Sequence, residues 1–305
     1  MTDRQPRRAR RVQLSTPGSS EKMIQKASES KADHVFLDLE DAVAPSQKRD
    51  ARKKIIAGLK SLNWTGKTRC VRINDLTTEY AFEDIIEVVE GAGEHLDTIM
   101  MTKVLTPADV LFADKLLHQL EKKLKLKRRI GLEALIEEVE GMQNVDAIAK
   151  STPRLECLVF GMGDFSASMG VTNKNVGETD GYPGDIWHYA RFRLIMACRA
   201  AGIDPVDGPF ADFKNPDAYR EECRRSMTLG AVGKWAIHPS QIDIALDVYS
   251  PKPEDIARAR KLEKAYAEAE AQGLGAINVD GIMVDVASIR ILRNTVLNKA
   301  DLFGM

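Results

Sequence analysis

The stretch CLVFGMGDFSASMG, from Cys157 to Gly170, starts as an apolar run and ends in small and acidic residues. Its first four residues have the length and composition of a buried strand. Gly161 and Gly163 then interrupt the run, and Asp164 follows directly. A carboxylate at the end of a core strand, between residues too small to shield it, raises the question of what balances its charge.

Seven more apolar, β-branched runs lie along the chain, and they begin at Val12, His34, Thr68, Thr98, Arg129, Asp204 and Gly233. The segments between them have helical periodicity, and Thr106 before Pro107 is the expected start of one helix. Eight strands alternating with helices predict a (β/α)₈ TIM barrel. A doubly wound open sheet is the alternative, but no glycine-rich dinucleotide loop follows the first strand.

We therefore expect a barrel over residues 12–250, a flexible basic arm over residues 1–11 and a C-terminal extension over residues 251–305. The arm, MTDRQPRRARR, is expected to be disordered, with contact to phosphates or a transit peptide as alternatives. The extension reads as a long polar helix, a hairpin turning at Asp280-Gly281 and a last helix. It is either a packing appendage or a lid.

The formal net charge of −1 gives no whole-protein field toward nucleic acid or a membrane, so neither is expected as a partner. The four cysteines, Cys70, Cys157, Cys198 and Cys223, form no C-x-x-C pair. This favours a reduced, cytoplasmic compartment and argues against a cysteine metal site.

In such barrels the active site forms at the carboxyl ends of the strands. The polar residues expected there are Asp38, Glu40, Asp41, Arg72, Asn74, Lys103, Glu133, Glu137, Asp164, Asp207 and His238. Most of them are acids. Gathering several carboxylates in a partly desolvated mouth is costly unless a cation neutralises them.

Glu137 and Asp164 follow consecutive strands, and two carboxylates plus waters are a usual set of Mg²⁺ ligands. The sequence contains no cluster of histidines and cysteines that would indicate a zinc site. The alternative is that Asp164 caps a helix beginning near Phe165. Gly161 and Gly163 would let a substrate approach the backbone, where their N–H groups can hold an anion.

Arg72 is an inward-facing cation that can clamp a carboxylate or stabilise an enolate oxygen. Its alternative is a structural ion pair with Asp38 or Glu40. Alternation puts these two acids on one face of their strand, where they can hold Arg72 and Lys103 in place. We expect His238 in the core or behind the site rather than acting as a base.

The segments FLDLEDAVAP, VRIN, LEALIE, FGMGDFSASMG, DGPFADF, GKWAIHP and VDVAS occur in this order at barrel spacing. Together they resemble the HpcH/HpaI aldolase and citrate lyase β-subunit-like family, and within it the malyl-CoA and β-methylmalyl-CoA lyases. The resemblance runs from about Val12 to about Val296. It implies Mg²⁺-dependent, reversible cleavage of malyl-CoA or β-methylmalyl-CoA to acetyl-CoA or propionyl-CoA plus glyoxylate, with Mn²⁺ as a substitute ion.

Carried over to this sequence, the resemblance implies that Glu137 and Asp164 are metal ligands. Arg72 matches an arginine that contacts the reacting thioester and 2-oxo acid oxygens. Asp285 matches an acid/base on a C-terminal lid that closes over a neighbouring subunit's site. The family forms trimers and hexamers, so a homotrimer or homohexamer with the lid acting in trans is expected.

Gly163, Asp164, Glu40 and Lys26 are also expected to bind substrate. Close relatives often have an arginine at the position of Ser20, which weakens any CoA phosphate contact there, although Lys26 retains a basic position. A malyl-CoA thioesterase and a citramalyl-CoA lyase are alternatives on the same scaffold. A non-catalytic metal- or CoA-binding barrel is the alternative from a different class.

Overall fold

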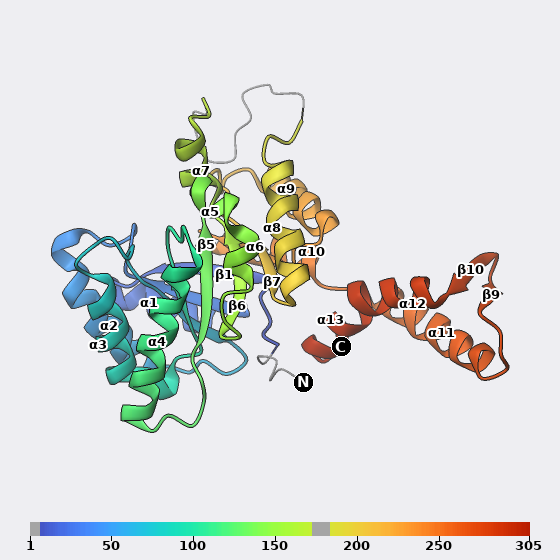
Figure 1. Ribbon diagram of the computed structural model, residues 1–305, viewed down its shortest axis with the longest axis horizontal. Helices are drawn as coiled ribbons and strands as arrows, with labels where there is room; N and C mark the ends of the chain where they lie inside the picture. Colours follow the sequence, from blue (N-terminus) through green and yellow to red (C-terminus); the bar gives the residue numbers. More distant parts are fainter. Residues whose placement is uncertain (1–6, 173–183) are drawn as a thin grey trace. The chain divides into compact units, whose positions relative to one another are not determined.

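The computed structural model describes residues 7–172 and 184–305 (Figure 1). Within these residues, eight parallel strands close into a barrel in sequence order, as β1 pairs with both β2 and β8. The strands are β1 (Val12–Pro17), β2 (His34–Asp38), β3 (Thr68–Arg72), β4 (Thr98–Met101), β5 (Gly131–Ile136), β6 (Leu155–Phe160), β7 (Asp204–Asp207) and β8 (Gly233–Ala236). The predicted (β/α)₈ barrel is confirmed.

Helices connect successive strands, as parallel pairing requires, and one further helix follows the last strand. They are α1 (Glu21–Glu29), α2 (Lys48–Ser61), α3 (Ala81–Ala92), α4 (Pro107–Leu124), α5 (Val139–Gln143), α6 (Val145–Ala149), α7 (Met162–Met169), α8 (His188–Ala201), α9 (Pro216–Leu229) and α10 (Ile242–Tyr249). Short 3₁₀ turns are η1 (Pro45–Gln47), η2 (Gly93–His95) and η3 (Pro239–Gln241). Helices α1 to α4 lie side by side in the blue and green part of Figure 1.

The barrel interior is filled by side chains from the strands, which is why the strands read as continuous apolar runs. One buried cluster comprises Phe36, Cys70, Met100, Leu135, Cys157, Val159, Val206 and Trp235. The rings of Phe36 and Trp235 lie 4.7 Å apart, and the Trp235 indole N–H donates to Gln13 Oε1 at 2.8 Å. In the described part of the chain, no helix is both long and apolar enough to cross a membrane.

The structure differs from the sequence expectation at the end of the basic arm. Arg10 is only 2% exposed, and its guanidinium lies 2.6 Å from Glu156, 3.0 Å from Asp204 and 3.3 Å from Glu133. Arg11 pairs with Asp33 at 2.6 Å. These two arginines therefore belong to the barrel, because the acids at the starts of its strands are buried and need a cation.

Glu133 is also not where the sequence placed it. Its fully buried carboxylate accepts hydrogen bonds from Arg10, Gln13 and Thr98 and lies 2.9 Å from His34 Nε2. Burial alone would raise the pKa of Glu133, but His34 and Arg10 outweigh burial and hold that pKa well below its usual range. Glu133 thus belongs to the amino-terminal end of the barrel, not to the active-site rim.

The chain divides into two compact units, and the second comprises residues 248–305 with residues 7–9. Its elements are α11 (Pro253–Glu270), β9 (Ala276–Val279), β10 (Ile282–Asp285), α12 (Val286–Leu292), the π-helix η4 (Arg293–Leu297) and α13 (Asn298–Phe303). Asp280 and Gly281 both have positive φ, as a tight hairpin turn requires, so the predicted turn is confirmed. Leu262, Tyr266, Val284 and Ile289 form a small core within this unit.

We predict that Arg10→Met lowers the free energy of unfolding by about 3–5 kcal/mol, because it leaves buried acids without their cation. Chemical denaturation of the full chain measures this loss. Arg7→Met is the control, because Arg7 is exposed. Equal stability of the two variants would show that the Arg10 network contributes nothing.

Candidate active site

The carboxyl ends of β2 to β6 bring most of the expected residues to one rim. Asp38 and Arg72 end β2 and β3, while Glu40, Lys103 and Glu137 follow β2, β4 and β5 within two residues. Asp164 lies in the first turn of α7, directly after β6. Parallel strands share their carboxyl edge, so residues far apart in sequence meet there.

Arg72 is fixed by Asp38. Its Nε and Nη2 donate to the two carboxylate oxygens of Asp38 at 2.8 and 2.6 Å, a bidentate pair. The guanidinium also lies 5.7 and 5.4 Å from the ring centroids of Phe36 and Trp235. Asp38 in turn accepts the backbone N–H of Glu40 at 2.9 Å. The structural ion pair considered from the sequence is therefore present, and it orients Arg72 rigidly.

Glu40 and Lys103 extend this network across the rim. Glu40 Oε2 lies 2.9 Å from Arg72 Nη1, and Glu40 Oε1 lies 2.6 Å from Lys103 Nζ. Lys103 Nζ also lies 3.3 Å from Asp164 Oδ2. The backbone N–H of Lys103 donates to Glu137 Oε1 at 2.9 Å. Lys103 therefore contacts three carboxylates, two through its ammonium and one through its backbone.

Glu137 is a buried acid, with 5% of its surface exposed. Burial raises the pKa of Glu137 to about 8, and the charges of Glu40 and Asp164 add to the rise. No lysine or arginine side chain in the described part of the chain forms an ion pair with Glu137. Ionised Glu137 therefore needs a further positive charge at the rim.

Gly161 provides the space that Glu137 occupies. A Cβ at position 161 would lie 2.5 Å from Glu137 Cβ and 2.7 Å from Glu137 Oε2, closer than such atoms can approach. The sequence suggested that Gly161 lets a substrate approach the backbone. The contact that the structure shows is instead with the Glu137 side chain.

Asp164 does not cap α7, so that alternative is wrong. The helix begins at Met162, Gly161 holds the N-cap position, and Asp164 is the third helical residue. Its side chain is 42% exposed and faces Lys103. A carboxylate in the first turn is favoured by the positive end of the helix dipole. Gly163, half-buried, lies in the same turn.

The donor set at this rim fits Mg²⁺. Glu137 and Asp164 offer hard carboxylate oxygens, and the charge of Asp164 acts on Glu137. Among the described residues, the one trio of histidine, cysteine and acid ligand atoms within 4.8 Å of each other is His34, Cys70 and Glu133. That trio lies at the opposite end, and its Glu133 carboxylate is already engaged by Arg10, Gln13, His34 and Thr98.

Lys48 is a residue that the sequence analysis missed. It is buried, and its Nζ donates to the carbonyls of Leu39 and Glu40 at 2.8 and 3.0 Å and to Asn74 Oδ1 at 2.5 Å. Burial lowers the pKa of Lys48. It ties the ends of β2 and β3 together behind the rim. In the sequence SQKRDARKK no pattern distinguishes Lys48 from the other basic residues.

Three other expected residues lie away from this cluster. Lys26 is exposed on α1, and no hydrogen bond or ion pair among the described residues joins it to the rim. Asp207 is held by Arg191 and Lys234 at 3.0 and 2.7 Å, a structural role. His238 is exposed, so the expected place in the core is wrong, and its ring stacks on Phe213 with centroids 4.6 Å apart.

Asp285 belongs to the second unit and caps α12. Its Oδ1 accepts the backbone N–H and the hydroxyl of Ser288, both at 2.8 Å. These hydrogen bonds lower the pKa of Asp285 below its ordinary value. In this half-buried setting the Asp285 carboxylate is a weaker base than an ordinary aspartate.

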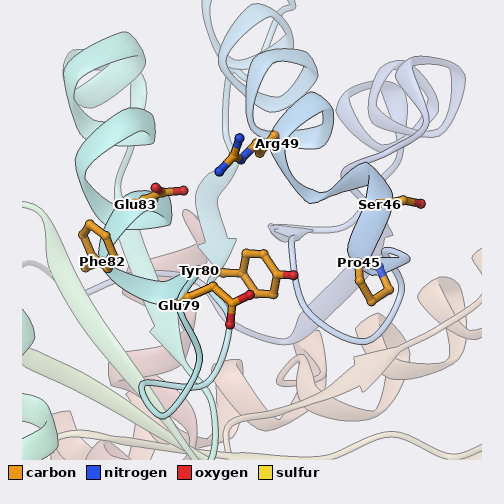
Figure 2. A pocket seen from close by; sticks show the side chains of 7 residues that line it. All are labelled: Pro45, Ser46, Arg49, Glu79, Tyr80, Phe82 and Glu83. Atoms are coloured by element: carbon orange, nitrogen blue, oxygen red, sulfur yellow. The ribbon is translucent and has the colours of Figure 1, made fainter.

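Two hollows adjoin the barrel rim. One, of about 500 Å³, is lined by Pro45, Ser46, Arg49, Glu79, Tyr80, Phe82 and Glu83. Figure 2 shows Arg49 on α2 and Phe82 and Glu83 on α3, with Tyr80 reaching toward Pro45. The other, of about 750 Å³, includes Lys103 together with residues that follow β3 and β5 and Ser168 of α7. Because Lys103 binds the acid cluster, the second hollow is the one that borders the candidate chemistry.

The raised pKa of Glu137 predicts a pH dependence of stability in the absence of divalent ions. The folded state holds the proton up to about pH 8, whereas an unfolded glutamate loses it near pH 4.3. Stability from this group is therefore full below that lower value and is lost as the pH rises through 8.

Glu137→Gln should remove this loss, so thermal melts in EDTA from pH 5 to 8.5 should fall less steeply for the variant than for the parent. Glu140→Gln, at an exposed position nearby, is the control and should follow the parent. A Glu137→Gln curve parallel to the parent would contradict the assignment.

The chain is similar to a family model, to curated proteins and to solved structures. The family model described as HpcH/HpaI aldolase/citrate lyase matches residues 11–239. The L-malyl-CoA/beta-methylmalyl-CoA lyase of Rhodobacter capsulatus is 41% identical over 295 residues, covering 93% of each chain. The mitochondrial citramalyl-CoA lyase of Homo sapiens is 32% identical, covering 94% of this chain and 84% of its own.

A solved structure, the protein CitE from Mycobacterium tuberculosis in complex with magnesium, acetoacetate and coenzyme A, is similar in fold. Its TM-score is 0.74 with 27% identity, and the match covers 95% of this chain and 97% of that one. The sequence resemblance is thus confirmed, and this chain belongs to the HpcH/HpaI aldolase/citrate lyase family.

Proposed function

We propose that this protein is a Mg²⁺-dependent CoA-ester lyase. It would reversibly cleave malyl-CoA and β-methylmalyl-CoA to acetyl-CoA or propionyl-CoA plus glyoxylate. The observation that carries this proposal is the rim cluster, in which Glu137 and Asp164 both meet Lys103 beside the oriented Arg72. The 41% identity to a lyase with these two substrates supports the choice of acyl group.

Glu137 and Asp164 would hold the ion, with Mn²⁺ as a substitute. When bound there, Mg²⁺ supplies a Lewis acid for the carbonyl of the 2-oxo acid. Gly161 keeps Glu137 at the rim by leaving space for its side chain. The exposed Asp164 leaves its side of the cluster open to solvent and therefore to a small 2-oxo acid.

Arg72 would stabilise the enolate oxygen that forms on the acyl-CoA. The α-proton of a thioester is weakly acidic, so the negative charge that develops needs a fixed cation nearby. The bidentate bond to Asp38 and the rings of Phe36 and Trp235 hold the guanidinium in one orientation. That orientation is set before substrate arrives, which is what such stabilisation requires.

Asp285 would be the acid/base. In condensation its carboxylate would take the proton from the acyl α-carbon, and in cleavage it would return that proton. The bonds from Ser288 keep it ionised in solvent, and desolvation on closure would raise its pKa. The neighbouring Met283 and Val286, 68% and 66% exposed, offer an apolar surface for closure over a neighbouring copy in a homotrimer or homohexamer.

The remaining contacts would bind substrate. The Gly163 N–H at the start of α7 is suited to an anionic group, and Glu40 positions both Arg72 and Lys103. Lys26, exposed on α1, would meet CoA phosphates. A cytoplasmic location fits the four free, buried cysteines.

Citramalyl-CoA is the second candidate substrate, because the human relative is a citramalyl-CoA lyase. Its cleavage yields pyruvate in place of glyoxylate. The two differ by one methyl group, which a pocket distinguishes by only about 1–3 kcal/mol. Direct comparison of the two 2-oxo acids separates them, and release of free CoA would instead indicate a thioesterase.

The direct test incubates the purified chain and Mg²⁺ with three pairs: acetyl-CoA and glyoxylate, propionyl-CoA and glyoxylate, and acetyl-CoA and pyruvate. Mass spectrometry should find a glyoxylate-dependent CoA ester that is lost with EDTA and restored by Mg²⁺ or Mn²⁺. Asp164→Asn should lower the rate at least about 100-fold, because it removes a metal ligand. Glu94→Gln, at an exposed position on η2, is the control and should leave the rate unchanged. No ester from any pair would refute the lyase.

Co-expression tests whether the lid acts in trans. Asp164→Asn and Asp285→Asn chains should each be inactive alone. In mixed oligomers about a quarter of the sites should combine an intact Asp164 with an intact Asp285 from the neighbour, and activity should return accordingly. Mixed oligomers with no recovered activity would show that each lid serves its own barrel.

A further inference from the structure

Lys103 is held in an unusual backbone conformation by the acids around it. Its φ is +48°, a left-handed conformation that non-glycine residues rarely adopt. This conformation accompanies a backbone N–H directed at Glu137 and a side chain that reaches Glu40 and Asp164. A lysine gains nothing locally from a positive φ, so the contacts with the carboxylates must stabilise it.

The two contacts of the Lys103 ammonium are unequal. The contact with Glu40 is 2.6 Å long, and the Glu40 side chain is buried and also paired with Arg72. The contact with Asp164 is 3.3 Å long, and both side chains are partly exposed. Glu40 is therefore the anchor, and Asp164 is the partner from which the ammonium can withdraw.

The Lys103 ammonium is the rim cation that lies near both candidate metal ligands. Arg72 is already committed to Asp38 and Glu40. Among the described residues, Lys103 is the cation whose charge acts on both Glu137 and Asp164, the candidate metal ligands. The Lys103 ammonium thus contacts a carboxylate oxygen of Asp164 that a divalent ion would also need as a ligand.

We propose that Lys103 competes with the divalent ion for Asp164. In the metal-free protein its ammonium neutralises Asp164, and on metal binding it withdraws to Glu40. The competition weakens metal binding and leaves the metal-free cluster of acids with a counter-charge. This inference rests on the proposed assignment of Glu137 and Asp164 as metal ligands.

The test measures Mn²⁺ binding to the full chain by electron paramagnetic resonance of the free ion, at fixed pH and ionic strength. Lys103→Met removes the charge and keeps an unbranched side chain. It should tighten Mn²⁺ binding about tenfold, because a competing ion pair and a like-charge repulsion are both lost. Lys103→Arg keeps the charge and should bind as the parent does.

Lys123→Met is the matched control. It removes an ammonium that also lies 2.6 Å from a glutamate, Glu90, but on the exposed surface of α4 and α3. This variant should bind Mn²⁺ as the parent does. Thermal melts show whether each variant folds, and Lys103→Gln replaces Lys103→Met if the latter does not.

Asp164→Asn separates the two ways in which the account can fail. If Asp164→Asn loses Mn²⁺ binding while Lys103→Met binds equally or more weakly than the parent, the competition is refuted and the metal site stands. If Asp164→Asn binds Mn²⁺ as the parent does, the metal assignment fails and the role of Lys103 fails with it. Lyase activity, measured separately, does not enter either result.

Discussion

Carboxylates buried inside a barrel are costly unless positive charge lies close to them, and this constraint organises both ends of the barrel. At the amino-terminal end Arg10 supplies that charge to Glu133 and Glu156. At the end of β7, Arg191 and Lys234 supply positive charge to Asp207. At the carboxyl rim Arg72 and Lys103 are shared among Asp38, Glu40 and Asp164. Glu137 forms no ion pair with a side chain in the described part of the chain, and its hydrogen-bond donor there is the backbone N–H of Lys103.

Glu133 and Glu137 show what this difference does, because they lie four residues apart in and just after β5. Both are buried, so desolvation raises both pKa values. His34 and Arg10 reverse the effect for Glu133, whereas Glu40 and Asp164 increase it for Glu137. Glu133, in β5, is therefore a structural acid already paired with cations. Glu137, just after the carboxyl end of β5, needs a further cation when it is ionised.

The elements with local signals were predictable from sequence. The barrel follows from eight apolar runs, the start of α4 from Thr106 and Pro107, and the hairpin turn from Asp280 and Gly281. The rim position of Arg72, Glu137 and Asp164 follows from their places at or after strand ends. Arg10 and Lys48 were not predictable, because the contacts that bury Arg10 span more than 100 residues and Lys48 is one of several similar basic residues. The role of Gly161 depends on the side chain of a neighbouring strand and has no sequence signal.

Catalysis as proposed depends on a divalent ion held by Glu137 and Asp164 at the carboxyl rim. Crystals grown with Mn²⁺ and measured at a wavelength where manganese scatters anomalously would locate the ion directly. We predict an anomalous peak in contact with carboxylate oxygens of both Glu137 and Asp164. A peak at His34, Cys70 and Glu133 instead, or none at the rim of a fully loaded protein, would contradict it.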